Sequence, residues 1–596
     1  GARNRPGARR SASVAIAGAP PWLGWALRPA GWPVASMQRA WLREFNSLGL
    51  QLRPQAAKQV TNFLQTCEDP QRMCEALVEH TKSYLRSRQG TVSAFIDKDV
   101  IDTVISCMHD AAKEASAVGG GVSTQDDAAR IETMHLGDGV YVHDAMTDIQ
   151  AFDYRRATKE WVPSKEKPSL FPGVNAKAKL YADRYHVLLN RMLLEGKLIT
   201  EAEFTASGGI LLPGQRVLTP VESLVGNPGS KLTFGLLTRL HDDNTRQWMI
   251  EDLHKVYPVE LNLKDSDHLM TDGSFVLAEG ELIDDKFHIT GLDVPAAVPR
   301  QVSKEKDNIP PQVFGGDLSE EQLKTLSVHE KSNPDGMYVV LSEVHLDSAR
   351  VLEKLADMFQ GYEDFAPPVA YVFMGSFCSS KFVQTSEGVR AYRDGFERLK
   401  FMMRSLTNHV QQGTRFVFIP GPNDPGPATL PRVPLPKYLT SDLQEEIPGV
   451  TMASNPCHIR HFSRELVFFR HDVLRLLRRH EVVPLRDPET SMAPSPQHVR
   501  NEMVRFMLDQ AHLVPLPLVE SNILWSYDHA LRLYPLPHAV FVGGISQPFD
   551  CVYQESQFCS VGPFCSLGPD GRGASFYAYH PVKEELETCD VPDRAG

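Results

Sequence analysis

The sequence of 596 residues predicts an α+β fold of several domains. Three observations predict it: helical apolar spacing near the amino end, five evenly long strands in the middle, and strands that alternate with helices in the second half. With 42% hydrophobic residues the chain can fill a core in each domain, and its length corresponds to about three or four domains.

Residues 1–36 are expected to be a disordered extension. They carry five arginines, no acidic residue and many Ala, Gly, Pro and Ser residues, a composition shared with organelle transit peptides. The chain begins with Gly, and Met37 opens an amphipathic stretch. We therefore favour an extension ahead of the true start codon, with a targeting peptide as the alternative.

Residues 37–116 are expected to form a small helical domain. Pro54 can open a helix at its first position, and Asp97 can cap a later one. Apolar residues follow Pro54 at helical spacing, at Ala57, Val60, Leu64 and Cys67. Four short helices can bury one small core. Residues 117–204 are then expected to hold a glycine linker and a bridging helix over 175–197.

Residues 205–300 are expected to form an OB barrel, because five strands of even length with tight turns are typical of that fold. The strands are predicted at 232–240, 248–253, 257–263, 275–283 and 286–292. An OB fold favours the binding of single-stranded DNA, whose bases would stack on aromatic side chains. The candidates are Trp248, Tyr257, Phe275 and Phe287.

The charge of this region opposes DNA binding. Residues 231–290 contain six Lys or Arg against twelve Asp or Glu, and the whole chain has a net charge of −12. Phosphate contacts need the opposite sign. We therefore interpret the four aromatic residues as core or protein-contact residues, and direct binding of single-stranded DNA is the alternative.

Residues 301–596 are expected to form an α/β layered domain, because short buried strands alternate with helices. Buried strands are predicted at 337–341 and 370–374. The stretches 415–419 and 465–469 are half-buried alternatives, and 539–542 is a fifth candidate. Asp347 is expected to cap one helix, and a second should run from Val389 to Val410. Functional groups of such domains lie on loops that leave the carboxyl ends of strands. Those loops here are 342–345 (Ser-Glu-Val-His), 375–376 (Gly-Ser), 421–424 (Gly-Pro-Asn-Asp) and 543–546 (Gly-Gly-Ile-Ser).

The order of these loops resembles the calcineurin-like phosphoesterases, which place D-x-H, G-D-x-x-D, G-N-H-D/E, an isolated His and G-H-x-H there. Two metal ions need such carboxylate, imidazole and amide ligands to activate a water. In this chain Ser376 stands in place of the bridging Asp, and Asp424 replaces a His. The eight positions of this vestigial metal site are Glu343, His345, Ser376, Asn423, Asp424, His471, Gly544 and Ser546.

The vestigial site predicts a phosphoesterase sandwich without catalytic residues, metal or cofactor, since too few carboxylates and imidazoles remain. His471 fits either the isolated His of the motif or a structural His. An active metal-dependent phosphodiesterase or 3′–5′ exonuclease is the alternative function.

Further residues narrow the resemblance. The loop Ile419-Pro-Gly-Pro-Asn-Asp-Pro425, the run 338–347 with 351–355, and the stretch 472–475 look like the B-subunits of eukaryotic replicative DNA polymerases. Within these, the chain resembles the epsilon family over roughly residues 37 to 590, by the arrangement of its domains. The resemblance implies a noncatalytic scaffold subunit in the nucleus.

The resemblance also implies partners. Its barrel and phosphoesterase-like domain would hold the zinc-bearing carboxyl-terminal region of the catalytic subunit of DNA polymerase epsilon. Its amino-terminal domain, similar to the helical lid of AAA+ ATPases, would contact the GINS part of the replicative helicase. Histone-fold accessory subunits would share the complex, and DNA would be contacted indirectly or weakly.

Two sequence patterns exclude other classes of protein. No run of about 18 apolar residues occurs, so no membrane span is predicted. The nine cysteines form no C-x-x-C pair, which argues against a zinc ribbon and for reduced thiols.

The basic cluster Arg475–His480 is interpreted as a solvated helix face, with a position near DNA as the alternative.

Overall fold

The computed structural model describes residues 51–65, single positions between 77 and 104, and residues 139–596 except for short gaps. The gaps are 157, 227, 243–244, 441, 487–492, 566–572 and 592–596. Our predictions for residues 1–36, for the glycine linker and for most of the helical domain lie outside the described residues. The chain divides into two units, residues 1–132 and 133–596, and each is described by itself.

The first unit contains the predicted helix that opens at Pro54. Helix α2 runs over Pro54–Gln65, and strand β1 (Gln51–Leu52) just before it pairs in parallel with β2 (Phe95–Ile96). The buried face of α2 carries Ala56, Val60 and Phe63. Of the predicted face, Val60 is buried and Ala57 is only half-buried.

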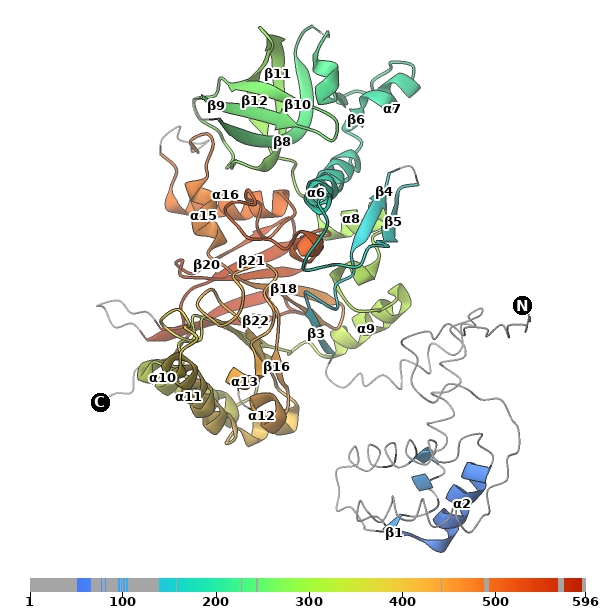
Figure 1. Ribbon diagram of the computed structural model, residues 1–596, viewed down its shortest axis with the longest axis vertical. Coiled ribbons are helices and arrows are strands. Elements are labelled where there is room, and N and C mark those ends of the chain that lie inside the picture. Colours follow the sequence, from blue (N-terminus) through green and yellow to red (C-terminus); the bar gives the residue numbers. More distant parts are fainter. Residues whose placement is uncertain are drawn as a thin grey trace, which may run out of the picture. The chain divides into compact units, whose positions relative to one another are not determined.

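The second unit contains a closed five-stranded barrel, which confirms the predicted OB fold (Figure 1). Its strands are β8 (Lys231–Asp242), β9 (Thr245–Glu251), β10 (Val256–Leu261), β11 (Ser274–Ile283) and β12 (Lys286–Asp293). Closure comes from β11, which pairs with both β12 and β8, so no edge of the barrel is left open there. Phe275 and Phe287 are buried in the core, as expected, whereas Trp248 and Tyr257 are half-buried against it.

Short elements before the barrel link it to the rest of the unit. The bridging helix is α6 (Ala176–Leu193), somewhat shorter than predicted. Strands β6 (Leu198–Thr200) and β7 (Arg216–Leu218), not predicted from the sequence, extend the barrel sheet in parallel with β8. The remaining elements are the hairpin β4 (Phe152–Arg155) and β5 (Glu160–Pro163), α7 (Glu201–Ala206) and η1 (Val221–Leu224).

The α/β part is a sandwich of two six-stranded sheets. The first has the order β16 (Val450–Met452), β15 (Arg415–Ile419), β14 (Ala370–Met374), β13 (Tyr338–Ser342), β22 (Ala574–His580), β23 (Glu585–Val591). The second has the order β20 (Phe549–Tyr553), β21 (Ser556–Val561), β19 (Ala539–Gly543), β18 (Arg464–Arg470), β17 (Cys457–His461), β3 (Val140–Asp144). One apolar cluster joins the inner faces of both sheets.

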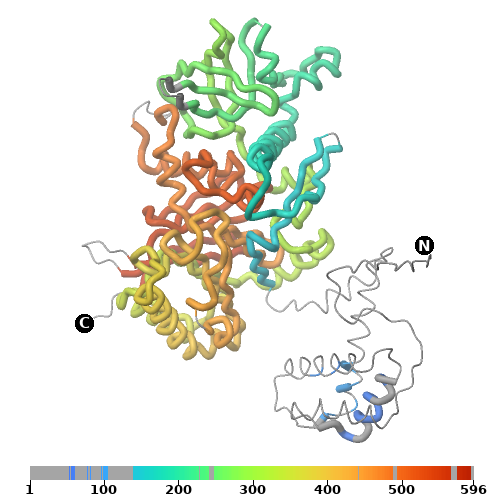
Figure 2. Tube along the Cα trace, in the orientation of Figure 1, coloured from blue at the N-terminus to red at the C-terminus, as the bar shows by residue number. Residues whose placement is uncertain are grey.

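Strand β3 comes from the stretch that the sequence assigned to the linker, yet it completes the second sheet by pairing with β17. Figure 2 follows the chain from this strand through the green barrel to the red strands at the carboxyl end. The segment between barrel and sandwich forms α8 (Arg300–Asp307), η2 (Pro311–Phe314) and α9 (Glu320–Ser332). Among the described residues no helix is long and apolar enough to cross a membrane.

Helices cover the outer faces of the sandwich. The first sheet packs against α10 (Ala349–Asp364), α11 (Ser386–Met403), α12 (Thr407–Gln412), α13 (Lys437–Thr440) and α14 (Leu443–Glu446). The helix predicted over 389–410 is thus two helices. Asp347 does not cap α10; its carboxylate instead accepts hydrogen bonds from the backbone and hydroxyl of Ser379.

The barrel packs onto the second sheet through α15 (Val473–Arg479), α16 (Pro496–Asp509) and η3 (Trp525–Leu531). One core cluster contains Phe287 of the barrel, Leu477 of α15, Phe506 of α16 and Val540 of β19. Barrel and sandwich therefore share buried apolar surface, which stabilises their mutual arrangement.

Candidate functional site

The structure brings the predicted strand-end loops to one edge of the sandwich. Strands β13, β14 and β15 are parallel neighbours in one sheet, and β18 and β19 are parallel neighbours in the other. The backbone N–H of Ser376 donates to Glu343 Oε1 (3.0 Å), and that of Asn423 donates to Ser376 Oγ (3.3 Å). The backbone N–H of His471 donates to the Gly543 carbonyl (3.1 Å).

The centre of this loop cluster is occupied by the guanidinium of Arg470, the last residue of β18. Its Nε lies 2.8 Å from Glu343 Oε1 and 2.7 Å from the Gly375 carbonyl, and a second nitrogen also contacts Glu343. Another nitrogen lies 3.3 Å from the Gly543 carbonyl and 3.2 Å from Asp472 Oδ1. One buried cation thus joins the ends of β13, β14, β18 and β19.

Glu343 is the main anionic partner of this cation. Its backbone lies in the left-handed region, with φ of 52°, which is uncommon for a residue with a side chain. Burial would raise the pKa of Glu343. The hydrogen bond with His345 Nε2 (2.9 Å), the charge of Arg470 and the Ser376 N–H together outweigh burial and lower the pKa to about 2. Glu343 is therefore an ionised partner of Arg470.

Asp424 is buried beside this pair, and its carboxylate bonds groups from three different segments. Its carboxylate accepts from the backbone N–H of Gly421 (2.6 Å) and Phe377 (2.8 Å) and from the Tyr392 hydroxyl (3.2 Å). Burial outweighs these bonds and raises the pKa of Asp424 to about 6. Asp424 therefore joins the loop at Gly421 to Phe377 and to helix α11.

The remaining predicted positions take no direct part in the ion pair of Arg470 and Glu343. His471 stacks on Phe469, with ring centroids 5.4 Å apart, and burial lowers its pKa to about 4. The structural interpretation of His471 therefore fits better than the metal-ligand one. Gly544 donates its N–H to the Val561 carbonyl (3.1 Å), and the half-buried Ser546 stands beside it in the loop.

These groups do not fit a pair of metal ions. The one carboxylate that matches the motif, Glu343, is neutralised by Arg470, and Asp424 points its oxygens at backbone N–H groups. Across the described part of the chain no group of three or more His, Cys, Asp or Glu side chains is placed to hold a metal ion. A two-metal site needs several such ligands around each ion.

Sequence reasoning missed two residues that hold this arrangement together. Arg470 sits at the end of a buried strand, directly before His471, and that position could have drawn attention to it. Asn455 donates from Nδ2 to the carbonyls of Pro420 (3.1 Å) and Arg470 (2.8 Å) and accepts from the Arg470 N–H (3.0 Å). No motif in the sequence signals that role.

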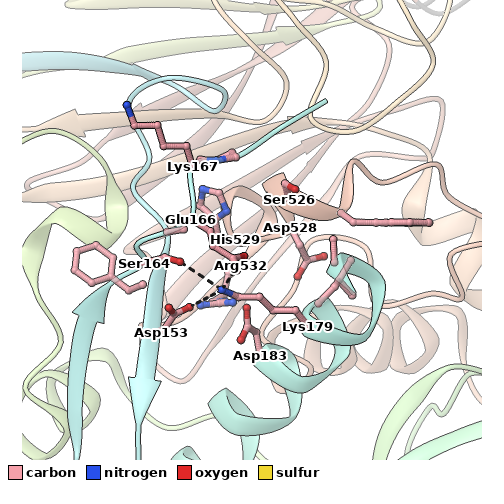
Figure 3. A pocket seen from close by; sticks show the side chains of 16 residues that line it. Asp153, Ser164, Glu166, Lys167, Lys179, Asp183, Ser526, Asp528, His529 and Arg532 are labelled. Carbon is pink, nitrogen blue, oxygen red and sulfur yellow. Dashed lines mark hydrogen bonds and ion pairs between the residues drawn. The ribbon is translucent and has the colours of Figure 1, made fainter. Parts of the chain in front are cut away.

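A second polar site lies where α6 meets β4 and η3 (Figure 3). Lys179 Nζ is 3.1 Å from Asp153 Oδ1, 3.7 Å from Glu166 Oε2 and 3.4 Å from Ser164 Oγ. Burial raises the pKa of the neighbouring Asp183 to about 6. The cavity measures about 70 Å³, room for a few water molecules, so it is too small for a nucleotide.

An OB barrel joined to a phosphoesterase-like sandwich defines the class of DNA polymerase B-subunits, and comparisons with known proteins agree. Residues 338–551 match the family described as the DNA polymerase alpha/epsilon B-subunit. Residues 174–296 match the family described as DNA polymerase epsilon subunit 2-like, OB-fold domain.

Similar proteins with known names show which kind of B-subunit this chain resembles. The DNA polymerase epsilon B-subunit of Arabidopsis thaliana is 30% identical over 445 residues, which cover 74% of this chain and 81% of the relative. DNA polymerase epsilon subunit 2 of Homo sapiens is 31% identical over 457 residues, with the same coverage. The corresponding subunit 2 of Bos taurus is 28% identical over 562 residues, 92% of this chain and 97% of its own.

The chain therefore belongs to the family of DNA polymerase epsilon B-subunits, whose members are accessory subunits of that polymerase. This confirms the resemblance stated from the sequence. A solved archaeal phosphodiesterase also aligns with 43% of this chain and 99% of its own, at 9% identity and a TM-score of 0.23. That likeness is too weak to support any argument.

Proposed function

We propose that this chain is a noncatalytic scaffold subunit of DNA polymerase epsilon that works in the nucleus. The observation that carries the proposal is the buried pair of Arg470 and Glu343 at the loops where a phosphoesterase would hold its metals. The guanidinium of Arg470 occupies this place and pairs with the carboxylate that a metal ion would need as a ligand. The loop cluster then serves to hold the two sheets in register.

The scaffold has two regions that bind different partners. The barrel and sandwich, which share one core, hold the carboxyl-terminal zinc-bearing region of the catalytic subunit, and histone-fold subunits complete the complex. The domain over residues 37–116 binds the GINS side of the replicative helicase. Two docking surfaces on one chain raise the effective concentration of the polymerase at the fork.

A manganese titration combined with a nuclease assay on the purified chain tests the absence of catalysis. We expect no stoichiometric binding of Mn²⁺ and no cleavage of a phosphodiester substrate. The variant Ser376→Asp, which restores the bridging carboxylate, should behave in the same way because Arg470 remains in place. Binding of two ions per chain, with cleavage abolished by His345→Ala, would overturn the proposal.

A further inference from the structure

The basic helix α15 is not explained by the scaffold role described so far. Its apolar side chains enter the core shared by barrel and sandwich: Val473 and Leu477 are fully buried, and Leu474 nearly so. The opposite face carries three exposed arginines, Arg475, Arg478 and Arg479. Because these positions follow an i, i+3, i+4 spacing, the three guanidinium groups lie on one side of the helix.

The three arginines are free within the part of the chain that the structure describes. No carboxylate there lies within 4.0 Å of any of them, whereas neighbouring cationic residues are paired. His480 lies 3.2 Å from Glu520, and Arg486 lies 3.3 Å from Asp265 and 2.6 Å from Asp267. On a chain of net charge −12, these three unpaired arginines form a local patch of positive charge.

The arginine face is held rigidly. Before the helix, Asp472 accepts from Arg470 (3.2 Å) and from the Ile545 N–H (3.2 Å). After it, the chain pairs with the barrel, where Val482 donates to the Met270 carbonyl (2.9 Å). A helix backbone fixed at both ends loses little conformational entropy when a partner binds.

Helix stabilisation does not account for all three arginines. Arg478 and Arg479 lie in the last turn, where positive charge interacts favourably with the helix dipole. Arg475 lies in the first turn, where positive charge is unfavourable, and it is nevertheless exposed on the same face. The helix dipole therefore does not explain why Arg475 shares one exposed face with Arg478 and Arg479.

We propose that the arginine face of α15, defined by Arg475, Arg478 and Arg479, docks an acidic protein segment within the polymerase complex. Guanidinium groups bind carboxylates through two parallel hydrogen bonds, and arginine is enriched at protein interfaces. Nucleic acid fits less well. Three arginines neutralise about three phosphates, which is half or less of a typical set of 6–10 contacts.

Arginine footprinting with phenylglyoxal tests this docking face. The docking proposal rests on the proposed assembly with the catalytic subunit. The free chain and the co-eluting complex are labelled without DNA and read by mass spectrometry. We expect the three arginines to be labelled in the free chain and protected in the complex. The exposed Arg398 on α11 serves as the control and should stay labelled. Failure to co-elute would instead count against the proposed function.

The triple variant Arg475→Glu, Arg478→Glu and Arg479→Glu gives a second measurement. We expect it to fold normally, since the three side chains are exposed, and to bind the catalytic subunit about tenfold more weakly at 50 mM salt, from three exposed ion pairs. The difference should shrink at 500 mM salt because exposed charges are screened. The matched control changes Lys324, Lys331 and Arg398, also exposed, to Glu and should bind as the wild type does.

Three results would overturn the docking face. The arginines could remain labelled in the complex, or both triple variants could weaken binding equally, which would reflect net charge alone. Protection that arises only after an oligonucleotide is added would assign the face to nucleic acid.

Discussion

The loop cluster around Arg470 and the surface of the OB barrel differ in where their charges lie. At the loop cluster Arg470 is buried against the Glu343 carboxylate, and both are fixed by backbone carbonyls and N–H groups. On the barrel the excess of acidic residues lies on the strands and turns of one module. We expect neither region to bind phosphate groups tightly, the first because Arg470 and Glu343 pair with each other and the second because its acidic residues repel phosphate.

This difference determines what each region contributes. A buried pair resists change, because removing one partner leaves the other charge without solvent or counter-ion. A surface charge excess costs little stability and is screened by salt. We therefore expect changes in the loop cluster to alter the stability of the sandwich, and changes in the charges of the barrel surface to alter binding more than stability.

The largest effect is expected from Glu343→Ala, which leaves Arg470 buried without its carboxylate. We expect the free energy of unfolding to fall by about 3–5 kcal/mol. Urea unfolding followed by circular dichroism measures it. The matched control is Glu279→Ala, which removes an exposed pair with Arg216 at 2.6 Å and should cost less than about 1 kcal/mol. Equal losses in the two variants would show that the loop-cluster pair has no special role.

An intermediate effect is expected on the pH dependence of stability, where Glu343 and Asp424 act in opposite directions. The pKa of Glu343 is lowered to about 2, so its contribution is present above the unfolded pKa and lost as the pH falls towards 2. The pKa of Asp424 is raised to about 6, so between about pH 4 and 6 the folded chain binds more protons than the unfolded chain. Stability from this group therefore falls as the pH rises through that window.

The variant Asp424→Asn removes the titration and should make the slope of stability against pH more positive between about pH 4 and 6. The change summed over the window is on the order of 2–3 kcal/mol. Urea unfolding at several pH values gives the slope, which is independent of the constant cost of replacing the carboxylate. An unchanged slope would mean that Asp424 is already ionised at pH 4.

The smallest effect is expected from Trp248→Ala on DNA binding. The wild-type chain should bind oligonucleotides no more tightly than roughly 10⁻⁴ to 10⁻⁶ M at physiological salt. Trp248 should not change this, because the guanidinium of Arg239 already lies over its ring, 4.2 Å from the centroid. Fluorescence anisotropy measures the affinity. Nanomolar binding that Trp248→Ala abolishes, with the fold intact, would assign a stacking platform to the barrel.

Phe287 is not a suitable probe of base stacking, although the sequence placed it among the candidates. It is fully buried in the core, so its replacement would test stability and not a surface. The alternation of strand residues suggests which aromatics face inward but does not show how deeply each is covered.

Local pattern was sufficient for much of the architecture. Five strands of even length predicted the barrel, and short apolar runs with turn residues predicted β13 and β14 together with the loops that follow them. Strand β15 was expected to be half-buried, but all its residues except Arg415 are buried. These features depend on residues close together in the chain, which is why periodicity and turn chemistry reveal them. The absence of motif ligands at Ser376, Gly544 and Ser546 was equally visible.

Only the tertiary structure showed what replaced the lost ligands. Arg470 and Glu343 are 127 positions apart, and β3 joins β17 across the whole barrel and its linkers, so neither contact leaves a local trace. Asp347 illustrates the same limit, because its carboxylate had a helix cap within reach but bonds Ser379 instead. Long-range pairing is decided by the sum of core packing and buried charge, which no single stretch of sequence contains.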